Sequence, residues 1–189
     1  MGLAKSRYEL LERAKELLGD VDVAIEIGVH YGEHAAAMNE ALRPTELYLI
    51  DAWGLCPGSR DSTESQEYWI KHKKMVEGMT RAHSHMKMIH SLAEDAVSSF
   101  DDESADFIYL DATHTYEMVA TELRDWWPKV KNGAIIAGDD YCDEYKPNDA
   151  IGVVRAVTEF REQHSEEIEV FEVFGEGLIS SWLIKMKSR

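Results

Sequence analysis

The feature that most constrains the fold is a regular alternation of short apolar runs with longer segments of helical periodicity. Each of five apolar runs has the length of a buried strand, and in each segment that follows, apolar residues recur every three or four positions. The predicted strands are residues 21–27, 46–50, 86–90, 105–110 and 133–137. The predicted helices are residues 6–18, 33–42, 66–81, 92–100, 115–127 and 150–163.

Parallel neighbours in a sheet need long crossover connections, which the helices between these strands provide. The end of the chain is different, since two alternating apolar segments, residues 168–174 and 178–186, are joined through Gly175 and Gly177. We therefore predict an α/β fold, a Rossmann-like three-layer α/β/α sandwich whose seven-stranded sheet is mostly parallel and ends in an antiparallel hairpin. In such a sheet, ligands bind at the carboxyl edge of the parallel strands.

The 189 residues, of which 44% are hydrophobic, have the size and composition of one domain. We expect a single domain over residues 1–189, opened by a leading helix within residues 1–20. Residues 52–82 begin with a polar segment that contains glycine, proline and serine, and we expect them to form a lid or a substrate-binding segment.

Charge and composition exclude several classes of protein. The formal net charge of −16 repels nucleic-acid phosphates and anionic lipids, so we expect neither a nucleic-acid partner nor a membrane partner. No run approaches the roughly 18 apolar residues of a membrane span, and the charged start lacks a signal-peptide core, which predicts a cytoplasmic protein. Cys56 and Cys142 lack the spacing of a metal site, so we expect reduced thiols. The sequence leaves a homo-oligomer open.

A glycine-containing turn follows the first predicted strand, with Glu26 before Gly28 and Gly32. Glycines there let a backbone approach a ligand closely, and the carboxylate of Glu26 suits an ammonium or hydroxyl partner while disfavouring a pyrophosphate. Asp51 ends the next strand, where a carboxylate accepts hydrogen bonds from both hydroxyls of a ribose or, alternatively, caps a turn. Trp53 follows, and it either packs on a bound adenosine or belongs to the core.

Three aspartates end the fourth and fifth strands: Asp111, and the pair Asp139 and Asp140. Adjacent parallel strands lie about 5 Å apart, so the three carboxylates would repel unless protons or a divalent cation such as Mg²⁺, Mn²⁺ or Ca²⁺ neutralised them. The alternative for the pair is a solvated turn. His114 follows Asp111 by three residues, where a neutral imidazole is suited to accept a hydroxyl proton or to cap the next helix.

The sequence resembles class I S-adenosylmethionine (SAM)-dependent methyltransferases at these residues. The resemblance implies that Glu26, Gly28 and Gly32 form the first cofactor motif and that Asp51 binds the ribose. It also implies, by a looser match, that the residues just after the third strand flank the adenine, and Asp111 is expected to adjoin the cofactor. The residues matched to the adenine are His90, Ser91, Leu92 and Ala93.

Within that class, residues 106–141 and 152–160 most resemble the metal-dependent O-methyltransferases, in particular the small bacterial branch that methylates sugars and antibiotic precursors. The resemblance covers about residues 23–160. It implies a divalent metal, expected to be Mg²⁺, on Asp111, Asp139 and Asp140, although many members of the metal-dependent group carry Asn at the position of Asp140. It also implies that His114 is the general base, since the sugar-modifying branch has His at this position.

The predicted function is therefore SAM-dependent methylation of a hydroxyl on a small molecule such as a sugar or a polyketide. The metal would chelate substrate hydroxyls while His114 takes the proton. Two alternatives stay open: a nicotinamide-dependent oxidoreductase, and a SAM-binding regulatory domain without catalysis. His30, Tyr31 and His34 border the glycine turn and face either the substrate or the helix surface.

Overall fold

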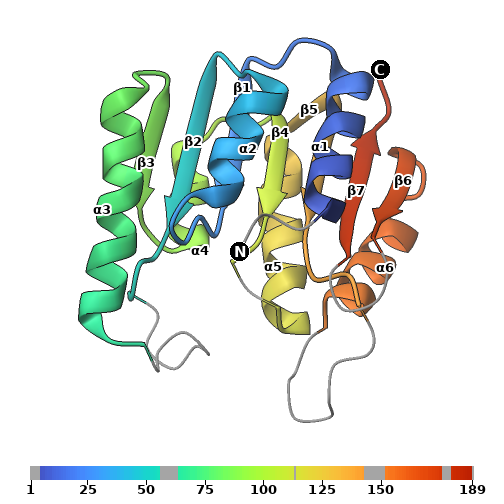
Figure 1. Cartoon of the computed structure of the whole chain (residues 1–189). Coiled ribbons are helices and arrows are strands. Elements are labelled where there is room, and N and C mark those ends of the chain that lie inside the picture. The colour runs from blue at the N-terminus through green and yellow to red at the C-terminus, as the bar shows by residue number, and fades with distance from the viewer. Residues whose placement is uncertain (1–4, 56–63, 113, 143–151, 176–179, 189) are drawn as a thin grey trace.

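The computed structural model describes residues 5–55, 64–112, 114–142, 152–175 and 180–188 (Figure 1). Its helices are α1 (Lys5–Leu18), α2 (Glu33–Leu42), α3 (Gln66–Ala82), α4 (Ala93–Ala96), α5 (Tyr116–Trp126) and α6 (Val153–Gln163), with the 3₁₀ turns η2 (Val97–Ser99) and η3 (Trp127–Lys129). Its strands are β1 (Val23–Ile27), β2 (Glu46–Asp51), β3 (Met86–His90), β4 (Ala105–Leu110), β5 (Val130–Gly138), β6 (Ile168–Phe174) and β7 (Ser181–Met186).

The seven strands form one sheet in the order β3-β2-β1-β4-β5-β7-β6. Strands β1 to β5 are parallel to one another, whereas β7 is antiparallel to both β5 and β6. The predicted Rossmann-like sandwich with a C-terminal antiparallel hairpin is therefore confirmed. Helices α1, α2 and α3 pack on one face of the sheet and α4, α5 and α6 on the other, which gives the three layers (Figure 1).

Both faces of the central strands are buried, because side chains of a strand alternate between the two faces of a sheet. In β4, Ile108 and Leu110 pack under α5 and α6, whereas Phe107 and Tyr109 pack under α1 and α2. This explains why the sequence shows continuous apolar runs at these strands. Among the described residues, no helix is long and apolar enough to span a membrane.

Several predicted boundaries differ from the structure, and three of these differences are the largest or bear on the site. Strand β5 begins at Val130, three residues before the predicted start, and Gly133 lies inside it at φ 79°, next to an irregularity in the pairing of β4 with β5. The predicted helix over residues 92–100 is a single turn, α4, followed by η2. Helix α6 begins at Val153, and residues 143–151 lie outside the described part.

The carboxyl ends of the central strands are held level by backbone hydrogen bonds. The N–H of Gly28 donates to the carbonyl of Ile50 at 2.9 Å, and the N–H of Asp111 donates to the carbonyl of Ile27 at 2.7 Å. The residues that follow β1, β2 and β4 therefore share one edge of the sheet. The first turns of α1 and α2 reach the same edge (Figure 1).

Candidate active site

Two glycines shape the turn after β1. Gly28 has a φ of 90°, and a Cβ on it would lie 2.2 Å from the carbonyl oxygen of Asp111. Gly32 also has a φ of 90° and caps α2, and a Cβ there would lie 2.6 Å from the sulfur of Met79. Residues that have a side chain rarely adopt this backbone conformation, so both positions require glycine. The turn thus lies directly against the end of β4.

Asp51 is fixed above this turn by three backbone donors. One carboxylate oxygen accepts from the N–H groups of Val29 and His30 at 2.8 and 2.7 Å, and the other accepts from the N–H of Trp53 at 2.7 Å. Burial raises the pKa of Asp51, and these hydrogen bonds oppose the rise. Trp53 is buried in the core, and its indole N–H donates to the carbonyl of His30 at 2.7 Å. Stacking of Trp53 on adenosine stays a prediction.

Glu26 and His34 form a buried pair beneath the turn. Only 1% of Glu26 and 3% of His34 is exposed, and Nδ1 of His34 lies 3.0 Å from Oε1 of Glu26. Burial raises the pKa of Glu26 well above its usual range and lowers that of His34 to about 3. Oε2 of Glu26 and Nε2 of His34 are buried without a hydrogen-bond partner among the described residues. Because buried polar atoms are normally satisfied, these two fit a polar ligand.

Arg7 of α1 is a site residue that the sequence analysis missed. Its Nε donates to Oδ2 of Asp139 at 2.8 Å, and its Nη2 lies 2.9 Å from Oδ2 of Asp111. The sequence carries a signal for this role, since Arg7 precedes Leu10 and Leu11 by three and four residues and so shares the buried face of α1. A cation on an apolar stripe implies a buried anionic partner.

The structure divides the predicted metal ligands. Asp139 is buried, accepts from the Ser181 hydroxyl at 2.6 Å and pairs with Arg7. Asp111 and Asp140 instead form a group with His114, in which one donor atom of each residue lies within 4.8 Å of the others. Strand β5 ends at Gly138 and Asp140 has a φ of 55°, so the chain turns here and Asp139 and Asp140 meet different partners. This donor set fits a divalent cation in its chemistry, and metal binding itself stays a prediction.

His114 is held by Asp140 and by the backbone. Its Nδ1 lies 2.9 Å from Oδ2 of Asp140, and its carbonyl accepts from the N–H of Gly152 at 2.7 Å. Burial lowers the pKa of His114, but the hydrogen bond to Asp140 and the charges of Asp140 and Asp111 outweigh burial and raise it. Burial likewise raises the pKa of Asp111 to about 8, although Arg7 opposes that rise. A histidine and an acid in this arrangement suit proton transfer.

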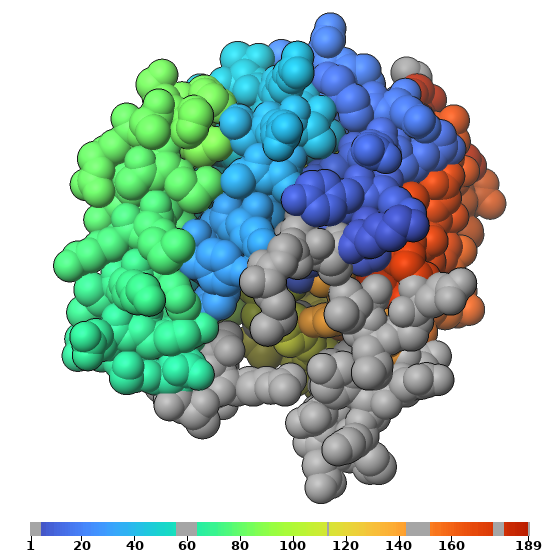
Figure 2. Space-filling model, in the orientation of Figure 1, coloured from blue at the N-terminus to red at the C-terminus, as the bar shows by residue number. Residues whose placement is uncertain are grey.

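Helix α3, from the predicted lid segment, packs on the glycine turn, where Met79 lies against Gly32. Figure 2 shows α3 in green beside the blue segment that contains α2. The ring of His72 lies 4.4 Å from that of His30, and Nε2 of His30 lies 2.5 Å from the Tyr68 hydroxyl. His30 therefore meets α3, while His34, which sequence reasoning placed at the surface or the substrate, is buried against Glu26. Residues 56–63 lie outside the described part, so the lid stays a prediction.

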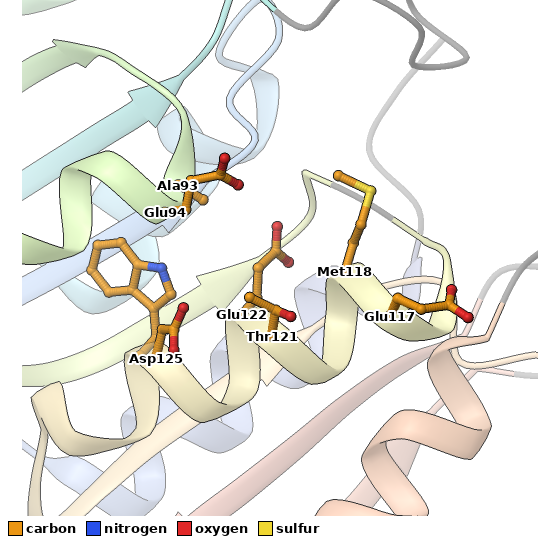
Figure 3. Close-up of a pocket in the computed structure, with 8 residues that line it drawn as sticks. Ala93, Glu94, Glu117, Met118, Thr121, Glu122 and Asp125 are labelled. Atoms are coloured by element: carbon orange, nitrogen blue, oxygen red, sulfur yellow. The ribbon is translucent and has the colours of Figure 1, made fainter.

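The residues predicted to flank adenine lie where β3 meets α4. The N–H of Ser91 donates to the carbonyl of Asp51 at 3.1 Å, which places this segment beside the predicted ribose acid. Next to it, α4 and α5 enclose a pocket of about 200 Å³. Figure 3 shows Glu94 extending from α4 toward the side of α5 that carries Met118 and Glu122. The lining residues are Ala93, Glu94, Glu117, Met118, Thr121, Glu122, Asp125 and Trp126.

Residues 25–141 match a family model described as a methyltransferase domain. The matched range contains the glycine turn, Asp51 and the group of Asp111, His114 and Asp140. The chain belongs to this methyltransferase family. It is a SAM-dependent methyltransferase, which confirms the predicted enzyme class over the nicotinamide-dependent alternative. No curated protein sequence is significantly similar to this methyltransferase.

Solved structures share the fold over nearly the whole methyltransferase. A Corynebacterium glutamicum protein has a TM-score of 0.69 at 14% identity, covering 100% of this chain and 84% of its own. An O-methyltransferase from Bacillus cereus in complex with SAH has a TM-score of 0.61 at 16% identity, covering 98% and 82%. An rRNA methylase from Streptococcus thermophilus has a TM-score of 0.68 at 9% identity, covering 100% of both chains. At these identities the likeness shows the fold, and the fold leaves the acceptor open.

Proposed function

We propose that this methyltransferase transfers the methyl group of SAM to a hydroxyl oxygen of a small molecule. The observation that carries the proposal is the pair of His114 and Asp140, joined at 2.9 Å beside Asp111, on the sheet edge that holds the cofactor motif. A sulfonium methyl group is already activated, so the protein has to align the acceptor and remove its proton. A histidine oriented by an aspartate supplies that second function.

The residues of the glycine turn are proposed to bind the donor. Asp51 keeps a lone pair on Oδ1 for a ribose hydroxyl, since Oδ1 accepts only from the N–H of Trp53, whereas Oδ2 already accepts from two backbone groups. The Oε2 atom of Glu26 is buried and lacks a hydrogen-bond donor among the described residues, and the ammonium group of SAM would provide one. The residues at positions 91–93 would flank the adenine.

His114 is proposed to remove the acceptor proton. When its Nδ1–H donates to Asp140, the other ring nitrogen keeps a lone pair and accepts a proton from a hydroxyl within hydrogen-bond reach. Asp140 also stabilises the imidazolium that forms, because a carboxylate next to a histidine favours its charged form. The proton leaves the hydroxyl as its oxygen attacks the methyl carbon, and the sulfonium becomes a neutral thioether.

A divalent metal remains part of the proposal. Asp111, His114 and Asp140 would hold it, and when bound it would lower the pKa of an acceptor hydroxyl. Carboxylates suit Mg²⁺ and Mn²⁺, whereas an imidazole ligand favours transition metals over Mg²⁺. A ring nitrogen of His114 that binds a metal cannot also accept a proton. Measuring turnover while metal is added to the enzyme therefore separates the two roles.

The acceptor is proposed to be a small molecule instead of RNA. The net charge of −16 repels a phosphate backbone, and four of the acidic side chains line the pocket between α4 and α5: Glu94, Glu117, Glu122 and Asp125. We keep the cytoplasm as the predicted compartment and leave the oligomeric state open.

The test is methyl transfer from labelled SAM to a panel of sugars, phenols and polyketides, with total RNA as a parallel acceptor. We expect label on the oxygen of a hydroxyl compound and none on RNA. Label on RNA alone, or on a nitrogen atom, would contradict the proposed acceptor class. The variant His114→Ala serves as the control for adventitious transfer.

A further inference from the structure

We propose that Arg7 and His34 bind the α-carboxylate of SAM, so that the start of α1 forms part of the cofactor site. This inference concerns the methyl donor and is independent of the acceptor that the methyltransferase uses. It follows from three features of one corner of the site: the orientation of the Arg7 guanidinium, the unpartnered nitrogen of His34, and the charge of the groups around them.

Arg7 reaches the sheet edge from α1 and has donors to spare. Its Nε and Nη2 contact Asp139, and Nη2 also contacts Asp111. Its Nη1 makes no hydrogen bond with a described residue, so two N–H groups remain for a further acceptor. The side chain is 21% exposed, which means that a ligand at this edge has access to it. Hydrogen bonds from a charged guanidinium to a carboxylate are stronger than those between neutral groups.

His34 provides an independent observation, because its Nε2 is buried without a partner in the described part of the chain. Its Nδ1 is occupied by Glu26 at 3.0 Å, and its ring lies 4.0 Å from that of Tyr109. A buried imidazole nitrogen is rarely left without a hydrogen bond. When Glu26 holds the proton that the pair shares, Nε2 of His34 carries a hydrogen and donates it.

The position of His34 adds to the attraction for an anion. It lies in the first turn of α2, and the N-terminus of a ten-residue helix carries a partial positive charge. The charge of Arg7 also acts on His34. Burial is the main cause of the lowered pKa of His34, and the Arg7 charge is the second. Arg7, His34 and the start of α2 therefore form one corner with favourable potential for a carboxylate.

Charge complementarity identifies the ligand group. SAM carries two cationic groups, the sulfonium and the ammonium, and one anionic group, the α-carboxylate. The neighbouring carboxylate of Asp139, which pairs with Arg7, repels a further carboxylate. Arg7 contacts both Asp111 and Asp139, so we place the anionic end of SAM beside Arg7.

The experiment compares two ligands that differ in the amino-acid end. S-adenosylhomocysteine has the α-carboxylate, whereas methylthioadenosine has the adenosine and thioether but no amino-acid chain. We expect Arg7→Gln to weaken S-adenosylhomocysteine binding in calorimetry by about ten- to a hundredfold and to leave methylthioadenosine binding unchanged. His34→Ala should act in the same direction, and His34→Gln, which keeps an N–H near the position of Nε2, should restore part of the loss.

Arg13→Gln is the matched control, because Arg13 lies on the same helix and pairs with Glu172, away from the strand ends, at 2.9 Å. It should change neither ligand. Equal weakening of both ligands by Arg7→Gln, or no weakening of either, would overturn the proposal and leave Arg7 as a counter-ion of Asp139. Where Arg7→Gln does not fold, Arg7→Lys keeps the charge but loses the planar set of guanidinium donors, and it should still weaken S-adenosylhomocysteine binding selectively.

Discussion

At the scale of single residues, the ionisable side chains of this methyltransferase site occur in pairs. Glu26 pairs with His34, Asp139 with Arg7, and His114 with Asp140. Burying one charge alone is unfavourable, so each partner stabilises the ionised or hydrogen-bonded form of the other. The pairing also influences which of these groups carry a proton, so removing one partner should change the protonation of the other.

The first residue-scale prediction concerns Asp51. Removing its carboxylate in Asp51→Ala should cost about 1.5–3 kcal/mol of SAM binding, roughly tenfold or more in affinity, because a charged hydrogen bond to the ribose is lost. Calorimetry measures this directly. The variant also loses the three backbone contacts of Asp51, so Asp51→Asn, which can still accept hydrogen bonds, should lose less. Wild-type affinity in Asp51→Ala would contradict the assignment of Asp51 to the ribose.

A second residue-scale prediction concerns the pH dependence of turnover. His114 accepts a proton only when neutral, and Asp140 raises its pKa, so activity should rise with pH through an ionisation above 6.5. Asp140→Asn removes the carboxylate that favours the imidazolium, and the rising limb should therefore move to lower pH. The measurement is kcat/KM from pH 5 to 9. A limb that stays in place in Asp140→Asn would show that another group titrates.

At the scale of elements, the glycine turn after β1 couples the cofactor side of the site to β4. A Cβ at Gly28 would lie 2.2 Å from the Asp111 carbonyl, and the φ of 90° is strained for any other residue. Gly28→Ala should therefore lower the free energy of unfolding by about 1–3 kcal/mol and weaken SAM binding.

Gly78 in α3 offers the matched control for this prediction. A Cβ there meets nothing within 4 Å, and the residue is inside a helix, so Gly78→Ala should stabilise the fold by about 0.5–1 kcal/mol. Thermal unfolding distinguishes the two variants. Equal stability of Gly28→Ala and the wild type would mean that the turn relaxes away from β4 without loss.

At the scale of the whole molecule, the sheet and its edge could be predicted because their signals are local. Apolar runs ending in Asp51, Asp111 and Asp139 mark strand ends, and parallel strands bring such ends together. The partners of these acids could not be predicted, since Arg7 meets Asp139 across 132 positions, only after α1 has docked on the sheet. For the same reason the predicted trio of aspartates differs from the observed group of Asp111, His114 and Asp140.

A divalent metal at the proposed site should affect turnover and not cofactor affinity. Treatment with a chelator should abolish turnover and leave S-adenosylhomocysteine binding intact, because the donor contacts reside in the glycine turn and Asp51. Activity assays and calorimetry on the same chelated sample provide the two readouts. Full turnover in the metal-free protein would remove the metal from the proposal and leave His114 with Asp140 as the proton acceptor.

The most direct test of the account is the turnover of His114→Ala with a hydroxyl acceptor identified from the panel. A positioned base contributes about 10² to 10⁴ in rate, so kcat should fall by that factor while calorimetry gives an unchanged affinity for SAM. The wild-type limb of the pH profile should disappear in the variant. A His114→Ala protein that keeps both the wild-type kcat and the same limb would contradict hydroxyl activation by His114.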